Sequence, residues 1–115
     1  MNDIRRLTDE YRRLLVVWSE SASNPGAANR LFEANHRVYK QLRVSESGRA
    51  SIGSLMSDSM VAVRLGAATH SLAWNGEEAQ RTLEAIQFAS DSGFLAVDAE
   101  YTLLSWRNGA LDLDW

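Results

Sequence analysis

The sequence predicts an all-α protein: a short α-solenoid of about five to six helices, arranged as antiparallel hairpins in a single domain over residues 1–115. Apolar residues recur at three- and four-residue steps, which is the period of an amphipathic helix. Runs of β-branched residues with period two are absent from the sequence, so strands have little support. The clearest unit is the hairpin at 58–90, where two helical segments flank a tight Asn75-Gly76 turn.

Two long helices are predicted in the N-terminal part of the chain. The first runs from about Asp3 to Glu20, and its apolar residues share one face. Asn24 followed by Pro25 predicts the start of the second helix, with Asn as N-cap and Pro at the first helical position. That helix runs to about Arg43. Its predicted inward residues are Leu31, Phe32, Val38, Tyr39 and Leu42.

In the middle of the chain, the sequence predicts a loop, a short helix and the hairpin. Residues 45–49, SESGR, are polar and predict a loop, and a short third helix ends near Met56. Asp58 then predicts the N-cap of the fourth helix. Asn75 and Glu78 have the spacing of a capping box at the start of the fifth. Short connections of this kind favour antiparallel neighbours.

A closing helix is predicted from about Leu95 to Asn108, after the break SDSG at 90–93. Gly109 is a stop signal, because glycine readily adopts the left-handed conformation that ends many helices. The predicted inward residues are Ala99, Leu103 and Trp106. The tail at 111–115, LDLDW, is expected to be loosely held.

Composition narrows the class of protein. The chain has no cysteine, which excludes disulfides and thiolate metal sites and fits a reducing cytoplasm, the location we expect. The apolar run Leu14 to Trp18 is far too short to span a bilayer, so no membrane association is predicted. The net charge of −3 is uneven: residues 1–57 carry +3 and residues 58–115 carry −6. Such asymmetry can orient a partner or a second copy.

The residues that could carry chemistry form no recognisable constellation. Glu33 and His36 have the Glu-x-x-His spacing of di-iron helical bundles, but the second copy is missing, because Ala67 stands three residues before His70. We therefore predict no metal site, no cofactor and no catalytic residue. His36 is expected on a polar helix face and His70 at a partly buried edge.

Several residues of the hairpin and the closing helix resemble a known family. Val63-Arg64 and Ala67-Ala68, followed by the ending DAEYTLLSWRNGAL from Asp98, are similar to a family of small uncharacterised bacterial proteins of unknown function. The resemblance covers about half the chain, residues 58–111. It implies a HEAT-like helical-repeat fold, in which small residues let stacked helices approach closely. It implies no catalytic residues.

The leading functional prediction is a non-catalytic protein–protein interaction module. Small size, an acidic C-terminal half and no visible active site favour this class, in a sharper form as an immunity- or antitoxin-like protein that binds by charge complementarity. The predicted partner is another protein or a second copy of the chain. Because Trp and Arg dominate interface hot spots, Arg64, Trp74 and Arg107 are the candidate interaction surface.

Two alternatives stay open. The first is a small-ligand binder or enzyme with a site between the helices, which would need His36 or His70 in a cleft with a carboxylate partner. The second is a weak nucleic-acid binder, which Asp9, Glu10 and a pI of about 5.3 oppose. Its N-terminal arginine strip would comprise Arg5, Arg6, Arg12 and Arg13, with Arg37 and Lys40 nearby.

Overall fold

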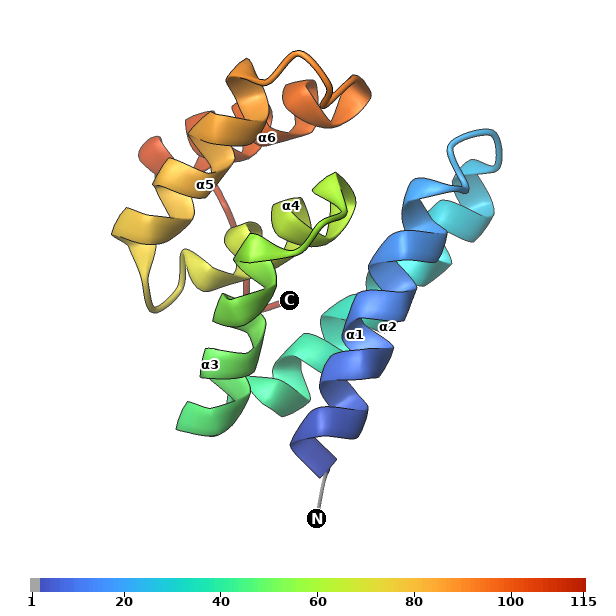
Figure 1. Cartoon of the computed structure of the whole chain (residues 1–115), viewed down its shortest axis with the longest axis vertical. Coiled ribbons are helices and arrows are strands. Elements are labelled where there is room, and N and C mark those ends of the chain that lie inside the picture. Colours follow the sequence, from blue (N-terminus) through green and yellow to red (C-terminus); the bar gives the residue numbers. More distant parts are fainter. Residues whose placement is uncertain (1–2) are drawn as a thin grey trace.

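The structure, a computed structural model, describes residues 3–115 and contains six α-helices, one 3-10 turn and no strand in that range (Figure 1). This confirms the all-α prediction. The elements are α1 (Asp3–Ser19), α2 (Pro25–Leu42), α3 (Glu46–Ser54), η1 (Leu55–Ser57), α4 (Val61–Ser71), α5 (Gly76–Phe88) and α6 (Phe94–Arg107). None of the helices in the described range has the length and apolar character that crossing a bilayer requires.

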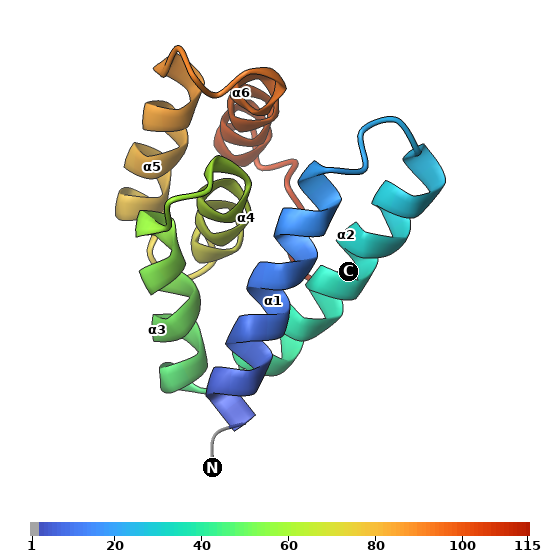
Figure 2. The same ribbon diagram turned by 45° about the vertical axis from the view of Figure 1, so that its right-hand side comes forward.

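Helices α1 and α2 lie side by side as a long antiparallel pair (Figure 2). The predicted cap is confirmed, since the Asn24 side chain accepts a hydrogen bond from the backbone N–H of Ala27 at 3.2 Å. Phe32, predicted inward, is instead 44% exposed. It stacks on Trp115 with ring centroids 5.8 Å apart, because it lies at the rim of the core.

The predicted loop at 45–49 is wrong, because α3 begins at Glu46. The Ser45 hydroxyl accepts a hydrogen bond from the Gly48 N–H at 3.0 Å, so Ser45 caps this helix. Gly48 is buried against the last turn of α2, where only a residue without Cβ fits beside the carbonyl of Leu42. A cap and a close backbone contact therefore outweigh the weak helix propensity of this segment.

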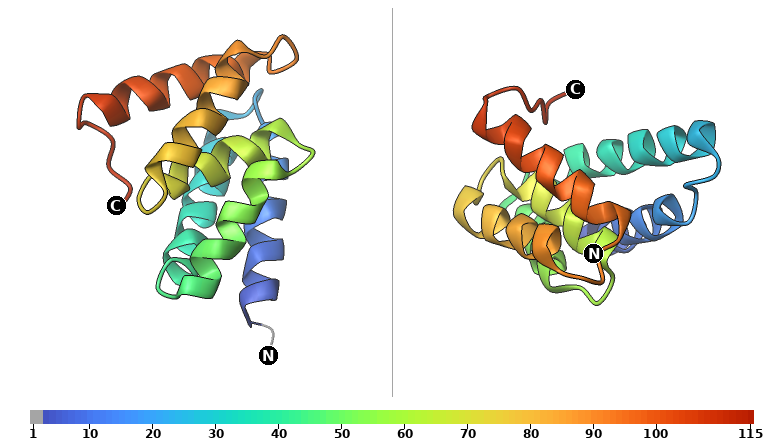
Figure 3. Two further views of the ribbon diagram at one scale, coloured as in Figure 1. Left: turned by 60° about the vertical axis from the view of Figure 1, so that its left-hand side comes forward. Right: turned by 90° about the horizontal axis from the view of Figure 1, so that it is seen from above.

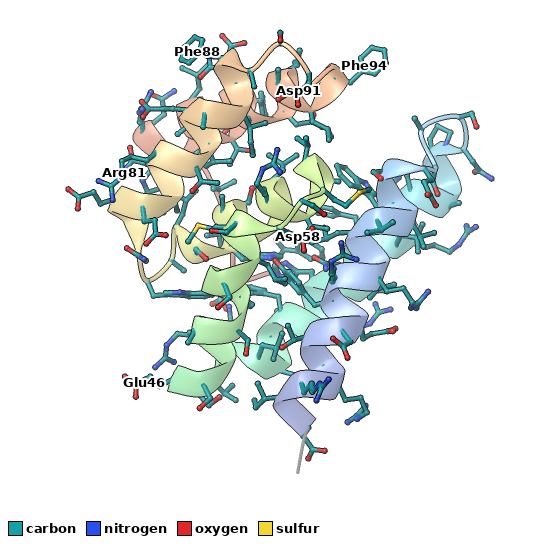
Figure 4. All side chains as sticks on the ribbon, in the orientation of Figure 1. Glu46, Asp58, Arg81, Phe88, Asp91 and Phe94 are labelled. Atoms are coloured by element: carbon teal, nitrogen blue, oxygen red, sulfur yellow. The ribbon has the colours of Figure 1, made fainter. Side chains whose placement is uncertain are left out.

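Asp58 does not cap α4 as predicted; the N-cap position is Met60. The Asp58 carboxylate accepts hydrogen bonds from Arg12 Nε at 2.8 Å, from Arg12 Nη2 at 3.1 Å and from the Met60 N–H at 2.9 Å. The bonds from Arg12 are the main reason that the pKa of Asp58 is lowered. Figure 4 shows Asp58 between η1 and α1, so this carboxylate connects the first helix to the start of α4.

We expect the Asp58→Asn variant to lose about 1–2 kcal/mol of unfolding free energy, because a two-point hydrogen bond to a partly buried carboxylate is lost. Urea denaturation at pH 7 measures this loss. Asp3→Asn is the control, since Asp3 is exposed and lies 3.9 Å from Arg6, a pair expected to contribute under about 0.5 kcal/mol. Equal losses in the two variants would contradict the role of Asp58.

Helices α4 and α5 form the predicted hairpin, and α6 lies across α5 and α4 at one end of the molecule (Figure 3). Asn75 occupies the N-cap position of α5, but its side chain makes no cap hydrogen bond to the backbone. It donates instead to the Glu78 carboxylate at 3.2 Å, so the predicted capping box does not form. The small residues Ala67 and Ala68 are fully buried, as close helix packing requires.

The segment after α6 is held to the fold, which corrects the expectation of a loose tail. Gly109 ends α6 with φ of +69°, as predicted. Residues 110–115, here called the C-terminal segment, then run from α6 toward α2 (Figure 3). Arg43, the C-cap residue of α2, donates to the Leu113 carbonyl at 3.2 Å and binds the Asp114 carboxylate. Trp115 stacks on His36 with ring centroids 3.8 Å apart.

Candidate functional site

The three predicted interaction residues contact different neighbours. Arg64 donates to the main-chain oxygen of Asp58 at 2.7 Å. The Trp74 ring lies 6.2 Å from that of Tyr39, and Arg107 pairs with a glutamate of α5 at 2.9 Å. None of these contacts joins one of the three residues to another. The surface formed by Arg64, Trp74 and Arg107 stays a prediction.

The N-terminal arginine strip is largely ion-paired. Arg12 is held by Asp58, and Arg13 donates twice to Glu10 at 2.9 Å. Arg6 lies 3.9 Å from another carboxylate of the same helix. These pairs reduce the positive charge that the strip could offer to phosphates. The nucleic-acid alternative stays a prediction, with no specific contact in its favour.

Both histidines lie in the core, which corrects the polar face expected for His36 and the partly buried edge expected for His70. His36 is 2% exposed and His70 is 4% exposed. α2 is covered over a wide face, because α1, α3 and the C-terminal segment all pack on it. The Tyr11 hydroxyl lies 2.6 Å from Nδ1 of His70, and the Tyr39 ring stacks on His70 at 3.8 Å. The aromatic groups therefore form one buried polar cluster.

Burial determines the protonation state of the two histidines in this cluster. It lowers the pKa of His36 to about 4, and the nearby cations Lys40 and Arg43 act in the same direction. Burial also lowers the pKa of His70 to about 3, with His36 as a further cause. At pH 7 both imidazoles are neutral; His70 is hydrogen-bonded to Tyr11 and stacks on Tyr39, and His36 stacks on Trp115. A general base works best with a pKa near the operating pH, and these values lie far below it.

A cavity of about 290 Å³ opens beside the cluster, between α1, α2, α4, α6 and the C-terminal segment. Both histidines line it, together with the carboxylates of Asp98 and Asp112. Burial raises the pKa of Asp98. Nε2 of His36 is buried and has no hydrogen-bond partner among the described protein groups. Histidines and carboxylates thus line the same cleft, but neither imidazole is hydrogen-bonded to a carboxylate among the described residues, and the small-ligand alternative stays a prediction.

Metal-binding geometry is a separate question. Across residues 3–115, no three His, Cys, Asp or Glu side chains gather closely enough to hold an ion. The His36 and His70 rings lie 5.5 Å apart between centroids and face each other at 52°. Their neighbours are aromatic rings, so the arrangement favours stacking.

The largest exposed apolar feature was missed by sequence reasoning. Four residues of α6, here called the α6 outer face, share one side of the helix: Phe94, Val97, Tyr101 and Leu104. Phe94 is 89% exposed and Tyr101 is 72% exposed. The buried residues Ala99 and Leu103 lie on the opposite side. The signal was present in the sequence, because apolar residues occupy both sides of this helix and a helix that is apolar all round is normally covered.

Phe88 at the end of α5 is a further exposed aromatic residue, at 78%. Figure 4 shows Phe88 and Phe94 projecting outward on either side of the loop that carries Asp91. The charged residues nearest this surface along the chain are Asp91, Asp98, Glu100 and Arg107, all exposed, and Arg107 already pairs with a glutamate of α5. An apolar patch with an acidic rim results.

Comparison with protein-family models, with curated proteins and with solved structures found no match. The case for a function therefore rests on the geometry of the α6 outer face and of the buried cluster.

Proposed function

We propose that this chain is a non-catalytic protein-binding module that packs the α6 outer face against an apolar helix of another protein. The supporting observation is the exposed face itself. Its four residues are spaced three, four and three apart, which is the a/d spacing of a helix that packs along a partner helix. Single exposed apolar residues are ordinary, whereas a contiguous patch of this kind marks an interaction site.

The size of the patch suits a standard interface. An aromatic side chain buries roughly 150–250 Å², so the four residues of the α6 outer face, two of them aromatic, offer about 500 Å². A stable complex of ordinary size buries about 800 Å² on each partner. The patch can therefore be the centre of such an interface, with polar residues completing the rim.

The charge around the patch favours a basic partner. Asp91 and Glu100 are exposed beside it, while the nearby cation Arg107 is already neutralised by its glutamate. Two copies meeting through this face would bring like charges together, which costs several kcal/mol. A partner helix flanked by Lys or Arg would be attracted instead. The homo-oligomer is thus the less favoured occupant.

The HEAT-like fold and the immunity- or antitoxin-like role are also part of this proposal. The resemblance to a HEAT-like bacterial family supports stacked hairpins that present an extended surface. Residues 58–115 carry a net charge of −6, which supports an immunity- or antitoxin-like role against a basic protein. We propose that this role is carried out in the cytoplasm. Arg64, Trp74 and Arg107 remain the second candidate surface for the same class of function.

A charge placed in the α6 outer face tests the proposal. We expect Val97→Glu to weaken partner binding at least about 30-fold, because a buried unpaired charge costs about 2 kcal/mol or more at an interface. The measurement is capture from source lysate at micromolar bait, with partners identified by mass spectrometry and affinities then determined with the purified partner.

Ala50→Glu is the matched control, since it adds the same charge at an exposed position of α3. Circular dichroism verifies that both variants keep the helical fold. A partner captured equally by both variants would place the interface elsewhere, and Arg64→Ala and Arg107→Ala would then test the second surface. Light scattering distinguishes self-association, and a dimer that Val97→Glu dissociates would replace the proposed partner with a second copy.

A further inference from the structure

We propose that the cavity between α1, α2, α4, α6 and the C-terminal segment binds a small aromatic amine, with its ring among the aromatic walls and its ammonium group facing Asp98 and Asp112. This cavity shares Tyr101 with the α6 outer face, but the inference does not rest on the proposed function. Three properties of the cavity lead to this class of ligand: the chemistry of its walls, its size, and an unpaired buried nitrogen.

The residues that line the cavity favour a ligand that has both an aromatic ring and a positive charge. Trp18, Phe32, Tyr101 and Trp115 line the cavity, and aromatic faces attract organic cations. Two carboxylates line it, and no Lys or Arg does. Asp98 is solvent-exposed and makes no ion pair or hydrogen bond within the described part of the chain, so its carboxylate is accessible to the ammonium group of a ligand.

The size limits the ligand to a small molecule. A cavity of roughly 150 Å³ accepts benzene, and drug-sized ligands occupy about 300–1,000 Å³. The volume of about 290 Å³ is therefore suited to a one- or two-ring molecule with a short amine arm.

A buried nitrogen beside the cavity is available to a polar ligand. Nε2 of His36 has no hydrogen-bond partner within the described residues, in a side chain that is only 2% exposed, and an unsatisfied buried polar atom is unfavourable. Trp115 covers the His36 ring at 3.8 Å, and Arg43 holds the segment that carries Trp115. A ligand that forms a hydrogen bond with His36 would satisfy this atom.

Calorimetric titration of the full chain at pH 7 tests the proposal with three matched compounds: tryptamine, the neutral tryptophol and the anionic indole-3-acetate. We expect tryptamine to bind roughly tenfold more tightly than tryptophol. Indole-3-acetate is expected to bind most weakly, because two carboxylates repel it. Asp98→Asn should lower the tryptamine affinity about tenfold and leave the tryptophol affinity unchanged.

Glu100→Gln is the matched control, because it removes a charge two residues away on α6, at an exposed position that does not line the cavity. It is expected to change neither affinity. Tryptophol binding as tightly as tryptamine would overturn the assignment of the cation. Tighter binding of indole-3-acetate, or no binding of any of the three at millimolar concentration, would overturn the site.

Discussion

Replacing Gly48 with alanine is expected to lower the free energy of unfolding by at least about 3 kcal/mol. An alanine Cβ at this position would overlap the main-chain oxygen of Leu42 and lie 2.6 Å from its carbonyl carbon. Both atoms belong to the backbone at the end of α2, so no side-chain rotation relieves the overlap. The turn from α2 to α3 would have to open, and the hydrogen bond from the Gly48 N–H to Ser45 would weaken with it.

Gly53→Ala is the matched control in the same helix. A Cβ at Gly53 meets no atom within 4 Å. Alanine is the better helix former by about 0.5–1 kcal/mol, so this variant is expected to be more stable than the wild type. Urea denaturation followed by circular dichroism measures both variants. A Gly48→Ala protein as stable as the Gly53→Ala protein would show that α3 does not lie against Leu42.

The second large effect is a loss of stability in mild acid. In the unfolded chain a histidine has a pKa near 6.5, whereas burial lowers the pKa of His36 to about 4 and that of His70 to about 3. Because the folded-state values are lower, the unfolded state binds more protons as the pH falls below about 6.5. The stabilising contribution is complete above that pH and decreases continuously toward the folded-state values. Between pH 7 and pH 5 we expect a loss of about 2 kcal/mol for His70 and about 1–2 kcal/mol for His36.

Unfolding free energies at half-unit pH steps from 7.5 to 5 measure this loss. Carboxyl groups with lowered pKa values, such as Asp58, contribute mainly below this window, so the histidines dominate it. His36→Gln cannot titrate and should reduce the slope by about half, even though it lowers stability at pH 7. A stability that stays flat down to pH 5 in the wild type would mean that both imidazoles are solvated.

Several elements of the fold could be predicted from the sequence because their causes are local. Asn24 with Pro25 caps α2, and Gly109 ends α6, through hydrogen bonds and backbone conformations that involve residues within four positions. The apolar period predicted α1, α2, α4, α5 and α6 within a few residues, and the same period predicted core residues such as Leu42 and Leu103.

The candidate sites depended instead on residues far apart in the chain. Aspartate is a residue type that often caps helices, yet the carboxylate of Asp58 binds Arg12, 46 positions away. His36 was expected on a polar helix face, yet the C-terminal segment places the Trp115 ring over it. A polar residue is buried only when distant partners supply its contacts, and one-dimensional spacing carries no information about those partners.

The sequence by itself thus determined that the chain is helical, where most of its helices lie and that disulfides are impossible, because these properties follow from local propensity and composition. Only the tertiary structure decided which polar groups are buried and which apolar face is left uncovered. Helix α6 shows the reason. Its apolar residues predicted a helix, but whether the side with Phe94 or the side with Leu103 is covered depends on where α4 and α5 pack.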